Sequence, residues 1–328
     1  MGTRLKGETK QQALEARFDQ LAAVTPEIDP CCTYAPWAFS AYEAFTPDAP
    51  RLVYDGDAGM ILLTRQEISS QRWILVPFEA NWRLGASLVG PEPEPLLEVI
   101  DELLTAYRGL GLLGCLLSGF PQEGLWADRL NQRVDQRALT GFLEVKGRHL
   151  ASLDGGVDGF LGRRSSKFRA ELRRGWRRME AEGIIAEHHQ APLGEYALNQ
   201  LFTRCLMVEA QSWKGQSEQG IDQPPSYDFY RRLLQRVNRR GALRLVILSR
   251  DGEDLAYAFG AVVGARFRGY QVSQREDVAR LMLGNLAQYA LIQHLCEEGV
   301  EIYDLGMEMP YKYRWAEELS LTCDWFLS

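Results

Sequence analysis

The chain has 328 residues, of which 46% are apolar and 25% charged, with a formal net charge of -7 and a sequence pI near 5.4. These values are typical of a soluble globular protein of two-domain length. They exclude disordered, collagen-like and disulfide-rich proteins, and proteins that coat nucleic acid through bulk positive charge. Because the sequence has neither the apolar run of a secretory signal nor about 18 consecutive apolar residues, we expect a cytoplasmic protein without a membrane span.

The cysteines and histidines do not form a metal-binding pattern. No CxxC or His-rich spacing occurs, and scattered cysteines in apolar stretches are typical of buried free thiols in a reducing compartment. We therefore predict no metal site. The residues concerned are Cys31, Cys32, Cys115, Cys205, Cys296, Cys323, His149, His188, His189 and His294.

The first half of the chain alternates apolar runs with turn signals after a polar N-terminal helix. LVYDGDAGMILL predicts a strand, an Asp-Gly turn and a second strand, and WILVPF predicts a third. Apolar residues at helical spacing over 94–108 predict a helix, and the short apolar run GLLGCLLSGF predicts a buried strand. We expect a mixed α and β domain with its own core.

A Gly-rich joint within 151–183 marks the predicted domain boundary and leads into a charged amphipathic helix. Beyond it the sequence predicts two helices around an irregular loop, three strands, a helix and a strand. These are 194–210, 211–226, 227–239, LRLVILS, LAYAFGAVV, FRGYQVSQ, 284–298 and EIYDLG, followed by the apolar stretch LTCDWFL. Both halves contain a strand, Asp-Gly turn, strand element, as a degenerate duplication would produce. We predict an N-terminal helical extension at 1–21 and domains at 22–150 and 151–328.

Trp213, Lys214 and Gly215 lie in EAQSWKGQSEQG, where a predicted helix stops. A lysine between a large aromatic residue and a glycine can project into a cleft as a cation for a carboxylate or phosphate. The alternative is a surface lysine in a flexible loop, since lysine is mostly exposed in proteins.

Gly284 and Asn285 open a predicted helix after a polar turn. Backbone N–H groups at a helix start, beside a residue without a side chain, can receive an anionic or carbonyl oxygen. The alternative is that Asn285 only caps the helix. His294 falls on the apolar stripe of this helix with Ala290 and Leu291, so we expect a core histidine there.

The run RRSSKFRAELRRGWRR at 163–178 carries eight basic residues against Glu171. Leu161, Phe168, Leu172 and Met179 form an apolar stripe that would dock this helix on the fold. The other faces could meet RNA, a nucleotide phosphate or an acidic partner protein. A solvated helix paired with neighbouring acids is an equally open alternative.

Lys312 lies between Tyr311, Tyr313 and Trp315, shortly after a predicted strand that ends near Asp304. The C-terminal end of a strand is a usual place for site residues in α/β folds. A lysine held between aromatic faces is partly desolvated and suited to stabilising an oxyanion or binding a phosphate. The alternative is a cation–π contact that only stabilises a surface loop.

The order of these motifs resembles that in GNAT-fold acyltransferases of the CelD-like branch, which are relatives of the FemAB aminoacyltransferases. The motifs are, in order, the basic helix SSKFRAELRRGWRRMEAEG, SWKG, FYRRLLQRVNRRGALRLVIL with RDG, and YDLG with YKYRW. The likeness spans about residues 150–318. It implies an α/β (α+β) fold of tandem GNAT-like domains that face each other across a cleft, each a mixed, mostly antiparallel sheet flanked by helices. Similar proteins move an acyl or aminoacyl group from a thioester or an aminoacyl-tRNA to an amine.

The resemblance also implies site residues. Lys312 matches the lysine of the FemAB-like YKxxF/W motif. The GNAT pyrophosphate loop is reduced to Arg280 and Gly284, and Met282 begins the tripeptide that replaces the Ser-Pro-Gly common in the CelD-like branch, so we expect an altered anion-binding turn. The residues expected to bind substrate are Trp213, Lys214, Tyr270, Gln274 and Tyr313. Those expected to bind the donor are Arg280, Gly284, Asn285, Arg173, Arg174 and Arg177.

The expected reaction is acyl transfer to an amine by direct attack, because no Ser-His-Asp or Cys-His arrangement is visible. Lys312 would stabilise the developing oxyanion and Lys214 would hold an acceptor carboxylate or phosphate, while Asp304 or Glu308 orients or deprotonates the amine. We expect acyl-CoA or an acyl carrier protein as donor, no tightly bound cofactor, and a small-molecule or cell-envelope amine as acceptor. The alternatives are a tRNA-dependent aminoacyltransferase whose donor docks on the basic helix, and a non-catalytic GNAT-like binding protein.

Overall fold

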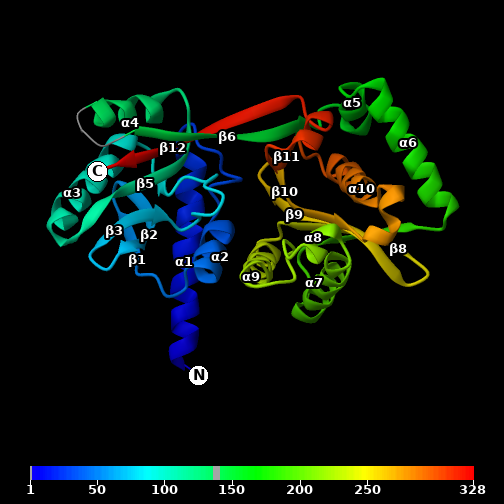
Figure 1. Cartoon of the computed structure of the whole chain (residues 1–328), viewed down its shortest axis with the longest axis horizontal. Helices are drawn as coiled ribbons and strands as arrows, with labels where there is room; N and C mark the ends of the chain where they lie inside the picture. The colour runs from blue at the N-terminus through cyan, green and yellow to red at the C-terminus, as the bar shows by residue number, and fades with distance from the viewer. Residues whose placement is uncertain (1, 136–140) are drawn as a thin grey trace. The chain divides into compact units, whose positions relative to one another are not determined.

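The computed structural model describes residues 2–135 and 141–328 (Figure 1). Contacts divide the chain into two compact units, Met1–Lys146 with Leu321–Ser328, and Gly147–Ser320. Each unit has its own hydrophobic core. The division differs from the predicted one at the C-terminus, because the end of the last strand pairs with a strand of the first unit.

The first unit is built on a sheet in which, among the strand pairs described, only β3 and β5 are parallel. Its strands in spatial order are β1 (Arg51–Gly56), β2 (Gly59–Ser69), β3 (Arg72–Pro77), β5 (Leu112–Pro121) and β12 (Glu318–Leu327), with β4 (Leu88–Val89) on β2. Its helices are α1 (Gly2–Val24), α2 (Ala35–Phe45), α3 (Pro93–Tyr107), η1 (Arg108–Leu110) and α4 (Leu125–Asp135). The predicted hairpin is confirmed, since β1 and β2 pair from Arg51 with Thr64 to Gly56 with Gly59.

The second unit has a mostly antiparallel sheet in which β10 and β11 are the parallel pair. Its strands in spatial order are β6 (Gly141–Ser152), β11 (Ile302–Met307), β10 (Arg266–Gln274), β9 (Glu253–Val263), β8 (Leu243–Arg250) and β7 (Ile185–Gln190). β6 and β12 carry the chain from one unit to the other. The short edge strand β7 has no alternation of apolar and polar residues, so the sequence did not indicate it.

Helices cover both faces of the second sheet (Figure 1). One face carries α5 (Gly156–Gly162), α6 (Ser166–Ala181) and α10 (Leu283–Glu297), and the other carries α7 (Glu195–Ala210), α8 (Trp213–Gln216) and α9 (Ser226–Arg239). Two 3-10 helices complete the unit, η2 (Glu276–Leu281) and η3 (Pro310–Arg314). The predicted irregular loop 211–226 thus contains the short helix α8.

The basic helix α6 docks through the predicted apolar stripe. Phe168, Leu172 and Met179 are buried in the core of the second unit. The helix begins later than the basic run does, because the Ser165 side chain accepts a hydrogen bond from the Phe168 N–H at 3.2 Å and caps it.

β10 and β11 pair over only three residues before they part. The paired residues run from Arg266 with Ile302 to Arg268 with Asp304, although both strands continue. β10 shifts its register with β9 between Gly269 and Gln271. The parting leaves the ends of two parallel strands beside η3, where the candidate site lies.

The remaining fold-level expectations concern membranes and thiols. Of the helices that the structure describes, none combines the length and apolarity needed to cross a membrane. All six cysteines are free and only Cys296 is partly exposed, as the sequence predicted.

Candidate functional site

Lys312 is buried at the start of the opening between β10 and β11. Its side chain is 8% exposed, and Nζ donates a hydrogen bond to the Met307 carbonyl at 2.8 Å. The Tyr311 ring centroid lies 5.8 Å from Nζ, and a Cβ placed on Gly306 would lie 3.8 Å from it. Nζ therefore lies beside strand backbone that has no side chain of its own.

Burial lowers the pKa of Lys312 from 10.5 to about 8, despite the opposing effect of the Asp304 carboxylate, and the nearby Arg268 guanidinium lowers it further. Lysine at this pKa is mostly protonated at neutral pH. The cation is thus desolvated before any substrate arrives.

Asp304, one of the two predicted bases, is buried beside two arginine side chains. One carboxylate oxygen accepts a hydrogen bond from the Arg148 guanidinium and the other accepts the Gly306 N–H at 2.7 Å. An Arg268 nitrogen lies 3.9 Å away. Because both oxygens are engaged, Asp304 holds the basic side chains and the end of β11 in place, and an amine has no direct access to it.

Glu308 is the exposed carboxylate of this region. Its N–H donates to the Gly147 carbonyl at 2.8 Å, and its side chain accepts a hydrogen bond from the Tyr313 hydroxyl. A Cβ on Gly147 would lie 2.8 Å from a Glu308 oxygen, so the glycine permits this close approach. Of the two carboxylates predicted as base, Glu308 is the one positioned to meet an acceptor.

His149 belongs to the same cluster and was not singled out from the sequence. Its ring is 2% exposed and packs edge-on against Tyr313 with centroids 4.4 Å apart. Burial lowers the pKa of His149, which the nearby Glu308 raises and Lys312 lowers. Its Nε2 is buried without a hydrogen-bond partner among the described residues. A strand in VKGRHLAS, had it been recognised, would have placed Gly147 and His149 on one face.

The Trp315 N–H donates to the Lys312 carbonyl at 2.9 Å, but the Trp315 ring lies in the core of the unit. Its ring is buried against Phe168 and Phe160, with centroids 4.9 and 6.3 Å away. It anchors the chain after η3 in the core of the unit. The three aromatic residues expected around Lys312 thus have different surroundings. Tyr311 lies near Nζ, Tyr313 packs against His149, and Trp315 belongs to the core.

Lys214 is matched by a carboxylate within the chain. Nζ lies 3.0 Å from the fully buried Glu209, and donates to Gln271 Oε1 at 2.9 Å and to the Val272 carbonyl at 3.2 Å. The prediction that it holds an acceptor anion is not supported, because its charge and its hydrogen-bonding capacity are already used. Trp213 beside it is 55% exposed.

At the start of α10, the Gly284 and Asn285 N–H groups have partners within the chain, and Asn285 is not the capping residue. The Gly284 N–H donates to Gln274 Oε1 at 2.7 Å, and the Asn285 N–H donates to the Met282 carbonyl at 3.0 Å. Met282, with φ of 55°, is the residue at the N-cap, so Asn285 does not cap the helix. Arg280 is exposed within η2.

Two further expectations concern Tyr270 and His294. Tyr270 is buried at the shift between Gly269 and Gln271, on the side of β10 where pairing with β11 has ended. His294 is not a core residue, since its Nε2 lies 2.9 Å from Glu298 at a partly exposed position.

The basic face of α6 is solvent-exposed. Arg173, Arg174 and Arg177 are exposed and have no carboxylate within 4.0 Å among the described residues. Glu171 pairs instead with Arg314. The run 163–178 thus shows both alternatives. Arg163 and Arg164 pair with Glu317 and Arg178 pairs with Glu182, whereas Arg173, Arg174 and Arg177 face solvent.

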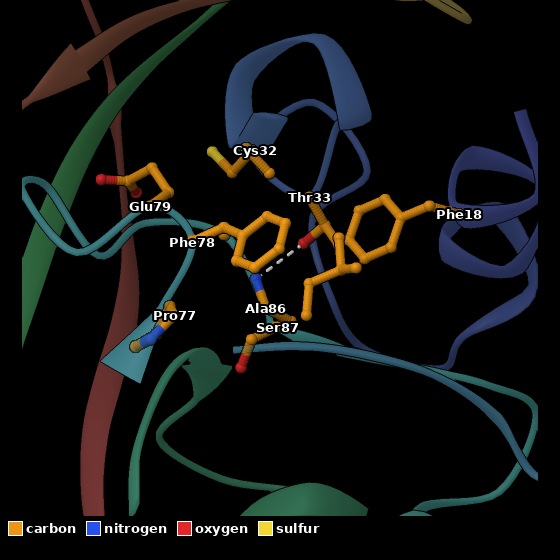
Figure 2. Close-up of a pocket in the computed structure, with 11 residues that line it drawn as sticks. Phe18, Cys32, Thr33, Pro77, Phe78, Glu79, Ala86 and Ser87 are labelled. Atoms are coloured by element: carbon orange, nitrogen blue, oxygen red, sulfur yellow. Dashed lines mark hydrogen bonds between the residues drawn. The ribbon is translucent and has the colours of Figure 1, made fainter. Parts of the chain in front are cut away.

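The first unit has its own hollow, of about 260 Å³, but its polar side chains serve the fold (Figure 2). Thr33 Oγ1 accepts the Ala86 N–H at 2.9 Å. The Glu79 carboxylate accepts the N–H groups of residues 82, 83 and 84 at 2.6, 3.1 and 3.0 Å. No basic side chain is among the residues described around it, so we place no catalytic site there.

Comparisons with known proteins agree with this geometry. Residues 166–313 match the family model of the acetyltransferase (GNAT) domain. None of the curated proteins compared with the chain matches it. The crystal structure of FemX is similar with a TM-score of 0.64 at 13% identity, over 95% of both chains.

Two further solved structures share the fold. The C-terminal domain of a putative lysylphosphatidylglycerol synthetase from Agrobacterium fabrum has a TM-score of 0.56 at 15% identity, over 96% of this chain and 93% of that one. A tandem GNAT protein from the clavulanic acid biosynthesis pathway has a TM-score of 0.50 at 10% identity, over 95% and 93%. The predicted mixed, mostly antiparallel, tandem GNAT-like fold is confirmed. The chain therefore carries a GNAT acetyltransferase domain at residues 166–313, as expected of a GNAT-like N-acyltransferase.

Proposed function

We propose that this chain, as a member of the CelD-like branch, transfers an acyl group from a thioester donor to the amine of a small-molecule or cell-envelope acceptor by direct attack. The observation that carries the proposal is the buried Lys312, whose pKa is lowered to about 8 where β10 and β11 part. A cation desolvated in advance stabilises a developing oxyanion more strongly than a hydrated one, because the local dielectric constant is low.

The reaction balances without a covalent enzyme intermediate. The amine nitrogen attacks the thioester carbonyl carbon, and the C–O electron pair moves onto the oxygen beside Lys312 Nζ. When the intermediate collapses, the oxygen electron pair re-forms the C=O bond, the C–S bond breaks, and the thiolate takes up the proton that the amine has passed to Glu308. Glu308 receives the proton that the amine loses, and the Tyr313 hydroxyl holds its carboxylate in place.

The remaining predicted residues have other proposed roles. Asp304 positions Arg148 and the end of β11. Trp213 and Tyr270 are proposed to contact the acceptor, while Lys214 supports the segment that carries Trp213.

A second candidate is transfer of an aminoacyl group from an aminoacyl-tRNA, an ester that the same oxyanion site would accept. The exposed arginines of α6 support it, and so does the likeness to FemX and to a lysylphosphatidylglycerol synthetase domain. A non-catalytic binding protein is not supported, since residues 166–313 match an acetyltransferase domain.

The test is a donor screen in which amide products are detected by mass spectrometry. The purified chain is incubated with acyl-CoA, acyl carrier protein or aminoacyl-tRNA and a defined mixture of primary amines. Lys312→Met should reduce transfer by roughly 10²–10³-fold, the usual cost of one oxyanion donor. The matched control is Lys10→Met, which replaces an exposed lysine of α1 and should transfer at the parental rate. Parental activity in a folded Lys312→Met variant would refute the proposal.

A further inference from the structure

In the turn between β10 and α10, N–H groups that could bind an anion already have partners within the chain. Of the first N–H groups of α10, that of Gly284 is bonded to Gln274 Oε1 at 2.7 Å and that of Asn285 to the Met282 carbonyl at 3.0 Å. A pyrophosphate is held at a helix start by N–H groups that have no partner. This turn therefore offers a CoA pyrophosphate little to bind.

The charges of the same turn are also matched. Arg275 lies 2.6 Å from Asp277 and 3.2 Å from Glu253, and Glu276 beside them is exposed. Arg280 adds one exposed positive charge, so the formal charges of the basic and acidic residues from 275 to 284 sum to zero. A dianion gains no net attraction from this segment.

The exposed positive charge lies on the neighbouring helix instead. α6 packs against α10 and η2. Arg173 and Arg177 are one turn apart on it and Arg174 lies beside them. All three are exposed, and none has a carboxylate within 4.0 Å in the part of the chain that the structure describes. The three arginines form a compact basic patch on a chain whose net charge is -7.

A shallow, largely apolar surface hollow lies next to this patch, and Glu171 and Asn285 are also at its edge. Phe168 and Leu172 of α6 line it together with Met282 and Leu286, and Met282 is 42% exposed. The Arg314 guanidinium covers the Phe168 ring at 5.0 Å, two residues along the chain from Lys312. Arg174 lies about 9 Å further along the helix from Phe168. The hollow therefore lies between the patch and the segment that carries Lys312.

We propose that the acyl group arrives on a small acidic protein, an acyl carrier protein with a thioester-linked pantetheine arm, which docks on the basic patch of α6 with an apolar side chain in the hollow. This inference rests on the proposed function and specifies its donor. A protein fits better than RNA, because three arginines beside an apolar hollow match a short acidic helix. A phosphate backbone needs a longer basic track than these three arginines provide.

The test compares the same octanoyl group on an acyl carrier protein and on CoA, with glucosamine, lysine and spermidine as amines. We expect kcat/KM for amide formation to be at least about tenfold higher with the carrier. Arg173→Gln, Arg174→Gln and Arg177→Gln together should remove most of this preference, since exposed ion pairs contribute about 0.2–1 kcal/mol each. The matched control changes Arg51, Arg72 and Arg108 to Gln, which are exposed arginines of the first unit, and should keep the preference.

A binding measurement separates this inference from the proposed function. The fluorescence anisotropy of a labelled holo carrier protein should show binding that weakens between 50 and 200 mM salt and is lost in the triple α6 variant. Equal kcat/KM for the two donors, with a neutral triple variant, overturns the inference and leaves the proposed function standing. Octanoyl transfer from neither donor, together with an absence of binding, overturns both. Loss of aminoacyl-tRNA transfer in the triple variant, without any use of the carrier, assigns the patch to RNA.

Discussion

Two lysines beside aromatic residues, Lys214 in α8 and Lys312 in η3, are in opposite electrostatic situations. Lys214 lies 3.0 Å from Glu209, which also accepts a hydrogen bond from Tyr257 at 3.0 Å. Lys312 donates to a backbone carbonyl, and burial lowers its pKa to about 8. The difference shows that an aromatic neighbour says little about the role of a lysine. A carboxylate in contact makes the cation structural, and its absence from the contacts leaves the cation available for a reacting oxygen.

The largest expected effect tests the division of roles between the two carboxylates near Lys312. Asp304→Asn should destabilise the protein by about 3–5 kcal/mol, because it leaves the buried Arg148 without the charge that it contacts. Glu308→Gln should leave stability within about 0.5 kcal/mol while lowering acyl transfer roughly 10²-fold. Urea denaturation and initial rates measure the two. Equal loss of activity in both variants, with normal stability, would indicate that Asp304 also acts as a general base.

The second prediction concerns the pH dependence of Lys312. Its folded pKa is lowered from 10.5 to about 8, so the unfolded state binds more protons between these values and the free energy of unfolding rises with pH across that window. Below pH 8 the buried, protonated lysine lowers the free energy of unfolding by about 3 kcal/mol. Lys312→Met should thus be more stable than the parent at pH 7 by up to that amount, and the difference should shrink by pH 10.5.

Activity should follow the same titration in the opposite direction. The protonated form stabilises the oxyanion, so acyl transfer should fall as the pH rises through about 8. Denaturation curves and acyl-transfer rates at each pH unit from 7 to 10 would measure the pH dependence of stability and of activity. A stability difference that does not change with pH would mean that Lys312 titrates as an ordinary exposed lysine.

The third prediction concerns the matched lysine. Lys214→Met should destabilise the protein by about 2 kcal/mol, less than a fully buried pair would, because the Lys214 side chain is 17% exposed. The added change Glu209→Gln should restore part of the loss, since it removes the uncompensated buried charge. Thermal melts of the single and double variants measure this coupling. If both single changes prove neutral, the pair does not stabilise the segment that carries Trp213.

The smallest effect concerns the occupied turn before α10. Gln274→Ala frees the Gly284 N–H, which one hydrogen bond now satisfies. We expect KM for acyl-CoA to fall about two- to fivefold, the value of one N–H donor for a phosphate oxygen. Gln274→Glu is the matched control, because it keeps the acceptor and adds a negative charge, so KM should not fall. An unchanged KM in Gln274→Ala would show that CoA does not use this turn.

The sequence determined the local elements of this protein. The stripe of Phe168, Leu172 and Met179 specified a docked amphipathic helix, and the Asp-Gly turn specified the first hairpin. The order of motifs was sufficient to predict the tandem GNAT-like fold and to single out Lys312. These signals depend on neighbours a few residues apart, so they can be read along the chain.

Only the tertiary structure decided which of the singled-out groups are already occupied. Asp304 meets Arg148, 156 positions away, and Lys214 meets Val272, 58 positions away. The aromatic residue expected beside Lys312, Trp315, proved to be part of the core. Asp304 is matched over a long separation, whereas Lys214 is matched by Glu209 of the preceding helix, and neither composition nor spacing indicated which of these groups the fold would bury together. Two lysines that looked alike in the sequence thus differ in their partners, a carboxylate for Lys214 and a backbone carbonyl for Lys312.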